Sequence, residues 1–480
     1  MRLLHVGDDF AGLRPCGLTL YVAALMEAQA AQGHEVAYVF SGRHYPRLER
    51  PRLKRWNSGA VKMFELIGSP SHAHWDGTRN PAMDLQEPVG EATFAAAVRA
   101  VRPEIVHIHE LSRLPSSVIE HAKAAGLPVV MTLHDYKPLC ASVRLLDADG
   151  ERCMRRDVGE DCARNCAGVP GGRAHLIDRT LGYEFGRLKQ AIPLARQVNF
   201  SSTAPLVAHA SALLHRAPAE GSLSETGPAP AADYQRRRDV NAERLGLCDR
   251  LIAPSRRVAE IYAALGVDRQ RLSVQRLTLP HLEGLRPSAS PAVGTPMTFA
   301  TLGGCASTAK GARSVVEAAL ALERDGHGSK YRLVVHGLVD EEATAELTQI
   351  PSVSIAGPYD PGDLESLLQD ADVGVLPSMW EEAHGFAGVE MLARGLPVIG
   401  TAFGGIPEYV REGETGWLNH SGSGAELADL MLAAINDRDE VLRLRRSVRA
   451  LNDEFARPMS VHVAEVQELY AELTSETATR

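Results

Sequence analysis

The sequence has little of several features that would assign it to common protein classes. Aromatic residues make up 5% of the chain, and no apolar run approaches the roughly 18 residues of a membrane-spanning helix. The opening MRLLHVGDDF has too short an apolar run for a signal peptide, and an acidic pair follows it. Seven cysteines without an export signal indicate a reducing compartment, where disulfides are not expected. We therefore expect a cytoplasmic protein; peripheral contact with the inner face of the membrane stays open.

Two nucleotide-binding motifs are also missing. No strand–GxGxxG–helix pattern is followed by an acidic residue about twenty positions later, which disfavours a dehydrogenase, and there is no P-loop of the Gly-x4-Gly-Lys-Ser/Thr type. The formal net charge is −9 and the isoelectric point is about 6.1. This mild acidity argues against general affinity for nucleic acid, so no nucleic-acid partner is expected.

What the chain does contain is a repeated α/β pattern in its first part. Its 480 residues and 45% hydrophobic content allow two or three domains with full cores. Glycines follow the helical segments, at Gly33 and Gly126. Short apolar runs typical of buried strands occur at 2–6, 34–40, 102–110 and 127–135, and helical spacing recurs over 19–32 and 116–126. This alternation predicts a doubly wound α/β domain.

The pattern weakens over residues 141–250, which include a cysteine cluster. A stretch rich in Pro, Ala, Gly and Ser at 215–234 is typical of a loop or insertion. The α/β alternation resumes at 248–266, and the turn-rich segment 286–297 predicts an interdomain linker. We therefore assign 1–285 to an N-terminal domain with an insertion at about 140–245.

A second α/β unit follows the linker. Its strands are expected at about 298–303, 331–336, 352–356, 372–376 and 397–400, with helices between them. Two such units leave a cleft between the carboxyl edges of their strands, where ligands of parallel sheets usually bind. We assign 298–457 to this C-terminal domain.

Two glutamates separated by seven residues occur just after the fourth strand of this unit, in WEEAHGFAGVEMLARGLPVIGTAFGGIPEYV (380–410). A helix is expected to start at 385–387 and to end at Arg394. Its first N–H groups carry partial positive charge, which suits a diphosphate. Glu382 and Glu390 would accept hydrogen bonds from hydroxyl groups on either side of the phosphates. The alternative, two solvated helix residues, is disfavoured by the glycine-rich context.

A lysine opens another helix of the same unit, in GGCASTAKGARSVVEAAL (303–320). Gly303 and Gly304 end a strand, and Lys310 and Gly311 begin the helix. The ammonium group would face the same cleft and suits a pyrophosphate as a point charge. The alternative is an ordinary surface lysine.

The N-terminal unit offers Gly17 between its first strand and helix, and His134 at the end of the strand in TLHDY. A histidine there can donate a hydrogen bond to a phosphate or a sugar hydroxyl, although a core or capping role stays open. His107 and His109 lie within a strand, and for them a core role is favoured.

Four cysteines lie on the loop-rich segment: Cys140, Cys153, Cys162 and Cys166. Four thiols can bind zinc tetrahedrally and hold a loop together, but the CxxC spacing of the strongest zinc motifs is absent. Structural zinc, unligated thiols, and an iron–sulfur cluster or disulfide all stay open. Any of these roles would be structural.

With these stretches in place, the chain resembles the retaining, nucleotide-sugar-dependent glycosyltransferases of GT-B fold, the large bacterial group that builds polysaccharides and glycolipids. The resemblance covers most of the chain, and 167–245 carries little of it. Its most specific part is PSMWEEAHGFAGVEMLARGLPVIGTAFGGIPEYVREGETGWL, which resembles the Glu-x7-Glu signature of the group. The resemblance implies two Rossmann-like domains facing each other across a cleft, with 458–480 as a helix that crosses back to the N-terminal domain.

The resemblance also implies roles for individual residues. Glu390 would bind the ribose, Glu382 would orient the donor sugar, and Lys310 would neutralise the leaving diphosphate. His134 would reach the donor from the N-terminal domain. The implied donor-binding residues are Gly17, Gly304, Gly385, Phe386, Ala387, Glu390, Gly404 and Gly405. No metal or other cofactor is expected for catalysis.

The sequence departs from the pattern of the group at several positions. Cys305 stands where an arginine is usual, so one of two cations is missing unless Arg313 or another residue replaces it. His384 replaces an aromatic residue, Cys16 replaces a glycine of the first loop, and QRLTLPH (275–281) replaces a usual Asn-Gly. These changes leave the donor undetermined.

We therefore predict a retaining glycosyltransferase that moves a sugar from a UDP- or GDP-linked donor to a hydroxyl of a glycan, glycolipid or small molecule. The alternatives are a GT-B-fold epimerase or nucleotide-sugar hydrolase, and a non-catalytic nucleotide-binding subunit. The oligomeric state is left open.

Overall fold

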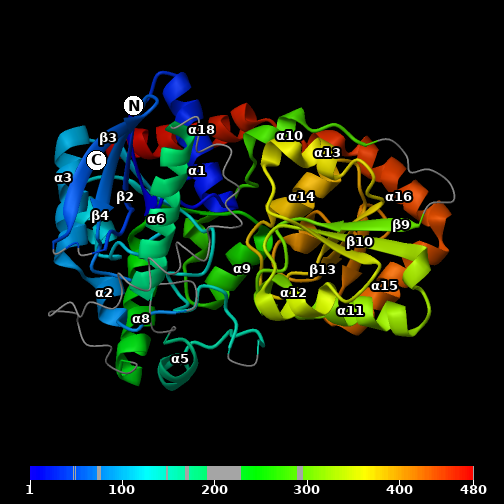
Figure 1. Ribbon diagram of the computed structural model, residues 1–480. Coiled ribbons are helices and arrows are strands. Elements are labelled where there is room, and N and C mark those ends of the chain that lie inside the picture. Colours follow the sequence, from blue (N-terminus) through cyan, green and yellow to red (C-terminus); the bar gives the residue numbers. More distant parts are fainter. Residues whose placement is uncertain are drawn as a thin grey trace.

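A computed structural model places two α/β domains side by side (Figure 1). It describes residues 1–46, 48, 50–72, 77–147, 150–167, 172–191, 229–288 and 296–478. The Pro/Ala-rich stretch lies outside the described residues up to 228, and its last residues open the helix α8 (Ala231–Leu247).

The N-terminal domain is built on an eight-stranded sheet with the order β3-β4-β2-β1-β5-β6-β7-β8. Neighbouring strands are parallel except for β3 and β4, which form an antiparallel hairpin at one edge that the sequence patterns did not predict. The strands are β1 (Arg2–Asp8), β2 (Glu35–Ser41), β3 (Arg52–Ser58), β4 (Val61–Ile67), β5 (Ile105–Ile108), β6 (Val129–Thr132), β7 (Arg250–Ala253) and β8 (Leu272–Val274).

Helices cover both faces of this sheet (Figure 1). The described helices as far as residue 284, not all of which lie on the sheet, are α1 (Gly17–Ala31), α2 (Pro81–Leu85), α3 (Pro88–Val101), α4 (Val118–Ala124), α5 (Gly159–Asn165), α6 (Gly172–Ala191), α8, α9 (Arg256–Ala264) and α10 (Pro280–Gly284). Side chains cap some of their ends: Ser255 accepts a hydrogen bond from the Val258 N–H at the start of α9, which satisfies a donor without an intrahelical partner.

The C-terminal domain has a six-stranded sheet, parallel throughout, with the order β11-β10-β9-β12-β13-β14. Its strands are β9 (Met297–Thr301), β10 (Tyr331–His336), β11 (Val353–Gly357), β12 (Val373–Leu376), β13 (Val398–Thr401) and β14 (Gly416–Asn419). Its helices are α11 (Ala312–Arg324), α12 (Glu341–Leu347), α13 (Leu364–Leu367), α14 (Phe386–Ala393), α15 (Gly424–Asn436), α16 (Arg438–Ala450) and α17 (Asn452–Phe455). Five of the strands lie where the sequence predicts them, and β14 is additional.

The final helix, α18 (Met459–Ala478), returns to the N-terminal domain and packs beside α1 (Figure 1). The Tyr21 hydroxyl lies 2.7 Å from His462 Nε2, and the Tyr470 hydroxyl lies 2.5 Å from His107 Nδ1. One buried apolar cluster accordingly includes side chains of both domains, such as Leu25, Leu376 and Val463. This shared core fixes how the two domains face each other.

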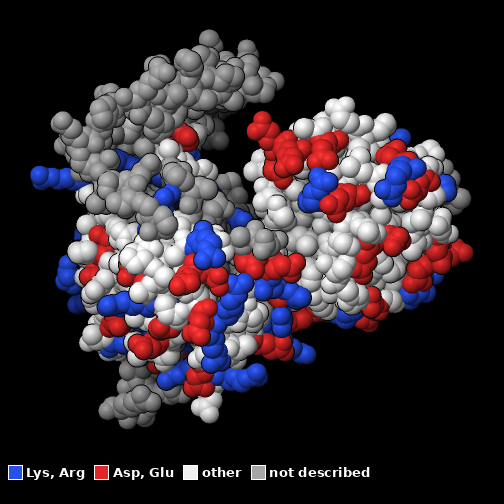
Figure 2. All heavy atoms as spheres, turned by 90° about the horizontal axis from the view of Figure 1, so that it is seen from below, with Lys and Arg blue, Asp and Glu red and all other residues white. Residues whose placement is uncertain are grey.

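None of the helices in the described part of the chain combines the length and the apolarity that a bilayer crossing needs. On the face that Figure 2 shows, basic and acidic side chains are intermingled over both domains.

Candidate active site

The buried carboxylate of Glu382 is central to the loop that joins β12 to α14. Its Oε1 lies 2.5 Å from Lys310 Nζ and accepts a hydrogen bond from Ser378 Oγ at 2.8 Å. Burial favours the neutral acid, but the Lys310 charge and these hydrogen bonds outweigh burial and lower the pKa of Glu382. The group is therefore an anion at neutral pH, held in a fixed place.

Lys310 comes from a different part of the sheet, the short turn 308–310 between β9 and α11. Its side chain is 42% exposed, and its ammonium lies 5.3 Å from the centre of the Trp380 ring. A cation fixed by a carboxylate on one side and an aromatic face on the other stays accessible to a further anion.

Gly404 and Gly405 support the loop that carries Glu382. The Gly405 N–H donates to the Glu382 carbonyl at 2.7 Å. Gly404 has a φ of +60°, and a Cβ there would lie 2.2 Å from the same oxygen. The two glycines thus allow a backbone approach that no larger residue permits. Their direct contact with a donor stays a prediction.

The helix α14 begins at this loop, after Gly385, and its N-terminus meets the N-terminal domain. Phe386 and Ala387 are half-buried. A Cβ on Gly17, the first residue of α1, would lie 2.9 Å from Phe386 Cδ2, so the start of α1 lies against the start of α14. Free N–H groups of a helix start therefore lie at the domain interface, where they can bind an anion.

Glu390 lies on the same helix, 6% exposed. One of its oxygens is engaged by His281 Nε2 of α10, at 2.8 Å. Tyr359 follows β11. Burial raises the pKa of its phenol, and the negative charge of nearby Glu390 raises it further. The other Glu390 oxygen is the acceptor that a ribose hydroxyl could use.

His134 reaches the interface from the end of β6. Its Nε2 lies 3.3 Å from His109 Nδ1, and its ring packs edge-on against Tyr21 at 5.1 Å. Burial, together with like charge from His462 and His384, lowers the pKa of His134 to about 3. His134 is therefore neutral at pH 7.

Three further residues, two in the loop after β9 and one in α11, bear on the charge near Lys310 and on the loop beside it. Gly304 packs its backbone against Leu338 at the end of β10, and its donor contact stays a prediction. Cys305 is fully buried in the domain core. Arg313 is half-exposed and pairs with Glu317 at 3.0 Å and Glu346 at 2.8 Å. The arginine suggested as a substitute for the missing cation therefore binds carboxylates on the outer face of α11.

The four cysteines of the loop-rich segment line one small cavity between α5, α8 and the preceding loop. Cys162 and Cys166 share a hydrogen bond, which is the main cause that lowers the pKa of Cys166 to about 7. No three of the four sulfur atoms lie within 4.8 Å of one another. Among the described residues, one group of potential metal ligands is that compact, and it contains no cysteine. The structure thus gathers the four thiols without closing a metal site, and zinc stays a prediction.

That other group is His5, His107 and His109, all buried in the N-terminal core. Each of their six ring nitrogens has a hydrogen-bond partner: Gln29, Thr132, Tyr470, His134 or another member of the group. Hydrogen bonding therefore accounts for these histidines without a metal ion.

Sequence reasoning missed the neighbour of Glu382. Glu381 is fully buried and binds Arg257 of α9 through contacts of 2.7 and 3.1 Å, and it accepts from the Gly404 N–H at 2.7 Å. Arg152, from the cysteine-rich loop, lies 3.4 Å from the same carboxylate and stacks over the Phe403 ring. The doubled Glu-Glu in the sequence was the available signal. This ion pair joins the two domains beside the site.

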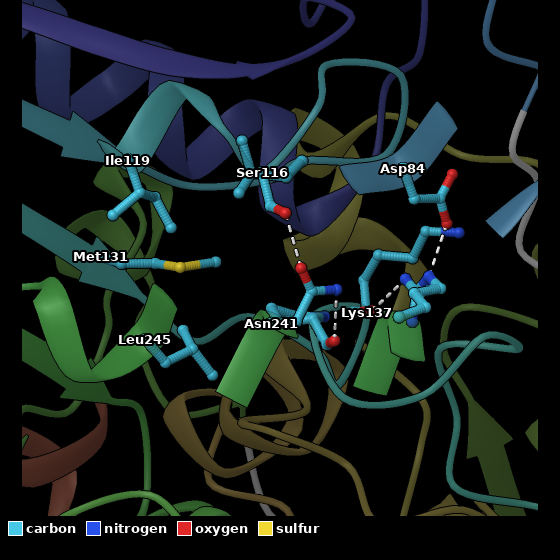
Figure 3. Close-up of a pocket in the computed structure, with 10 residues that line it drawn as sticks. Asp84, Ser116, Ile119, Met131, Lys137, Asn241 and Leu245 are labelled. Carbon is cyan, nitrogen blue, oxygen red and sulfur yellow. Dashed lines mark hydrogen bonds and ion pairs between the residues drawn. The ribbon is translucent and has the colours of Figure 1, made fainter. Parts of the chain in front are cut away.

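A pocket lies between α8 and the segment that follows His134 (Figure 3). Ser116 donates to the Asn241 side chain at 2.6 Å, and Arg237 binds Asp84 and the Lys137 carbonyl, each at 2.7 Å. These bonds fasten α8 to the segment that follows His134, which fixes where the strand end lies.

The comparisons with known proteins agree with this arrangement. The glycosyl transferase 4-like domain matches residues 17–158, and the model for glycosyl transferases group 1 matches residues 294–450. Among solved structures, sucrose-phosphate synthase from Thermosynechococcus elongatus aligns over 99% of this chain and 100% of its own, with a TM-score of 0.60 and 15% identity. HepE from Anabaena, solved with UDP-glucose, aligns over 98% and 99%, with a TM-score of 0.55 and 13% identity.

Curated relatives match over shorter segments. A D-inositol 3-phosphate glycosyltransferase of Corynebacterium aurimucosum is 36% identical over 85 residues, which is 18% of this chain and 20% of that protein. Another, of Pseudarthrobacter chlorophenolicus, is 27% identical over 261 residues, 50% of this chain and 60% of that protein. Each match thus spans less than two thirds of the relative. Because both halves of the chain match glycosyltransferase models and the fold is shared over nearly the whole length, this protein belongs to the GT-B glycosyltransferase family.

Proposed function

We propose that the protein is a retaining glycosyltransferase that binds a nucleoside diphosphate sugar at the domain interface and transfers the sugar to a hydroxyl group. The observation that carries this proposal is the Lys310–Glu382 pair, with a 2.5 Å contact, on the loop that leads into α14. A buried anion and an accessible cation stand there next to free helix N–H groups, and His134 approaches from the other domain.

The diphosphate of the donor would lie on the N–H groups of Phe386 and Ala387. Lys310 would share its charge between Glu382 and the phosphates, and would stabilise the negative charge that grows as the bond to the sugar lengthens. Because the ammonium is half-exposed and already oriented, little reorganisation is needed when the donor binds. No step of this scheme requires a metal ion.

The nucleoside and the sugar would lie on opposite sides of the diphosphate. Glu390 would accept a hydrogen bond from a ribose hydroxyl through the carboxylate oxygen that does not contact His281. The Tyr359 ring would lie nearby. Glu382 would face the sugar, where a fixed carboxylate favours the positive charge of an oxocarbenium-like sugar. The acceptor hydroxyl would attack from the face that the diphosphate leaves, and the departing phosphate would take its proton, so the anomeric configuration is retained.

The donor and acceptor are proposed by class. HepE was solved with UDP-glucose, which favours a uridine donor, and a guanosine donor is kept in the test. The relatives named for inositol phosphate and for polysaccharide synthesis (amylovoran, in Erwinia amylovora) favour polyol or glycan acceptors.

The experiment is a thermal-shift panel of uridine and guanosine diphosphate sugars in the presence of a chelator, followed by mass spectrometry of products with polyol and glycan acceptors. We expect one donor to raise the melting temperature and to give a transfer product whose anomeric configuration, measured by NMR, equals that of the donor. An inverted product would refute retention. A requirement for a divalent cation would refute the metal-free scheme, and free sugar or an epimerised nucleotide sugar as the main product would refute transfer.

A second candidate, a nucleotide-binding subunit without transfer activity, is favoured by one observation. Cys305 is buried and Arg313 pairs with two glutamates, so neither adds a second cation beside Lys310. Such a protein would bind UDP or GDP in the same panel and form no product with any acceptor.

A further inference from the structure

A row of hydrogen-bonded side chains leads from the core of the N-terminal domain to His134. Gln29 Oε1 lies 2.8 Å from His5 Nε2, and His5 Nδ1 lies 2.9 Å from His109 Nε2. His109 Nδ1 then lies 3.3 Å from His134 Nε2. Gln29, His5 and His109 are each at most 2% exposed, so water does not compete for these bonds.

The proton count along this row fixes the tautomer of every ring. A neutral imidazole carries one N–H donor and one acceptor nitrogen. The carbonyl oxygen of Gln29 can only accept, so His5 must donate from Nε2 and accept at Nδ1. His109 must then donate from Nε2, and the same holds for His134. The Nδ1 of His134 is left with a lone pair, and it forms no hydrogen bond with any residue in the described part of the chain.

The protonation state of the rings supports this proton count. Burial lowers the pKa of His5 to about 4 and that of His134 to about 3, and also lowers that of His109, so each ring is neutral and carries a single proton. The amide oxygen of Gln29 faces His5, and Gln29 Nε2 has no hydrogen-bond partner in the described part of the chain.

We propose that Gln29, His5 and His109 are positioning residues that hold His134 in its Nε2–H tautomer, so that Nδ1 accepts a hydrogen bond from a hydroxyl of the donor sugar. This inference rests on the proposed function for its ligand and on the described contacts for its tautomer. An ionised phosphate has no proton to donate, so His134 in this state recognises the sugar rather than the diphosphate. A donor that lacks the matching hydroxyl would therefore be discriminated against.

The tautomer is measured directly by long-range ¹H–¹⁵N NMR of histidine-labelled protein, with the His134 signals identified by their loss in His134→Asn. We expect the Nε2–H form in the wild type and in Gln29→Glu, whose carboxylate can only accept. Gln29→Met removes the acceptor at a similar side-chain volume, and should give a mixture of tautomers. Thr132→Val is the matched control, because it removes a hydrogen bond of His107 in the same core but leaves the row intact.

Kinetics with the donor found in the panel give a second readout. Gln29→Met should raise the KM for the donor about two- to tenfold, the size of one net hydrogen bond, with a smaller change in kcat, and Gln29→Glu should restore it toward the wild-type value. An Nδ1–H form of His134 in the wild type, or the same tautomer in Gln29→Met as in the wild type, would overturn the proposal. The NMR result is independent of transfer, so a protein that transfers no sugar refutes the proposed function without deciding the tautomer.

Discussion

The two domains contribute to the site in opposite ways. In the C-terminal domain, Glu382, Glu390 and the start of α14 come from one continuous stretch, and Lys310 is added from the neighbouring strand of the same sheet. In the N-terminal domain, Gly17 and His134 are separated by more than a hundred residues and are positioned by a buried polar core. One domain thus concentrates the charged groups in short loops, and the other presents neutral groups from a rigid interior.

This difference separates chemistry from positioning. Changes in the C-terminal loops should alter the charge at the reacting centre directly. Changes in the N-terminal core, whose residues do not touch the substrate, should act through the orientation of His134 and the stability of the domain. The predictions below test that division.

The largest effect is expected for Lys310→Ala. It removes the cation that would stabilise the leaving diphosphate, and kcat should fall by about a hundred- to a thousandfold, the range seen when a fixed stabilising group is removed. Steady-state kinetics with the identified donor measure this. Arg313→Ala, which removes an exposed cation on the adjoining helix, is the control and should keep wild-type turnover. Equal turnover in Lys310→Ala and wild type would contradict the assigned role.

The next effect is the loss of N-terminal stability in acid. Burial lowers the pKa of His5 to about 4 and that of His134 to about 3, while an unfolded histidine titrates near 6.5. The unfolded chain therefore binds more protons, and the free energy of unfolding falls as the pH drops from about 6.5 toward 4. Hydrogen exchange at several pH values measures this by segment.

In that experiment β1 and β5, which carry the linked histidines, should lose protection at higher pH than β9 and β12. His420→Gln, which changes an exposed histidine of the C-terminal domain, should leave the profile unchanged. Simultaneous loss in both sheets would show that the shared core of α1 and α18 couples the domains too tightly for the comparison to hold.

The C-terminal domain could be predicted closely from its sequence. Residues that act together there are near in the chain, and the apolar runs of β9 to β13 are bounded by turns, so period and spacing located both the strands and the start of α14. The rule that the carboxyl ends of parallel strands share one edge predicted that Lys310 and Glu382 face the same cleft. Their direct contact was not predicted.

The N-terminal contributions were less accessible because they depend on tertiary contacts. Nothing in the spacing of Gln29, His5 and His109 shows that they form one row, since they come from a helix and two strands that become neighbours after folding. The β3–β4 hairpin was missed because β3 is largely exposed and polar, with RLKRWNS giving little apolar alternation. Glu381 was overlooked for a related reason: its partners, Arg257 and Arg152, lie more than a hundred residues away.

A smaller effect is expected for Glu381→Gln, which tests how firmly the domains are joined. The substitution keeps an acceptor for the Gly404 N–H but removes the charge that binds Arg257 and Arg152. We expect unfolding to become easier by about 1–3 kcal/mol, the cost of weakening a buried, charge-assisted hydrogen bond. Chemical denaturation measures this. The pKa of Glu381 is lowered, since Arg257 and the other donors outweigh burial, so the difference from wild type should fade as acid protonates the carboxylate.

Glu260→Gln is the matched control for this pair. Glu260 is an exposed partner of Arg257, at 3.9 Å, and a surface ion pair of that kind contributes little. Equal destabilisation in the two variants would show that the charge of Glu381 does not hold the domains together.

The smallest effect on the stability of the whole protein is expected for the cysteine-rich loop. Cys140, Cys153, Cys162 and Cys166 line one cavity, and four thiolates are a ligand set that zinc accepts. We expect about one zinc per chain by elemental analysis, lost in Cys162→Ser and kept in Cys248→Ser, whose buried thiol lies elsewhere in the core.

The consequence should reach the site through Arg152. This residue lies between Cys140 and Cys166 and holds Glu381 and the Phe403 ring of the other domain. Arg155 and Arg156 are exposed in this loop. Removing the metal should loosen the backbone around them, speed trypsin cleavage there and raise the KM for the donor a few-fold. The melting temperature should change little, because the segment is small compared with either core. Zinc-free protein with the proteolytic pattern of the wild type would show that the thiols pack without a ligand, and that the loop is held by Arg152 and its neighbours alone.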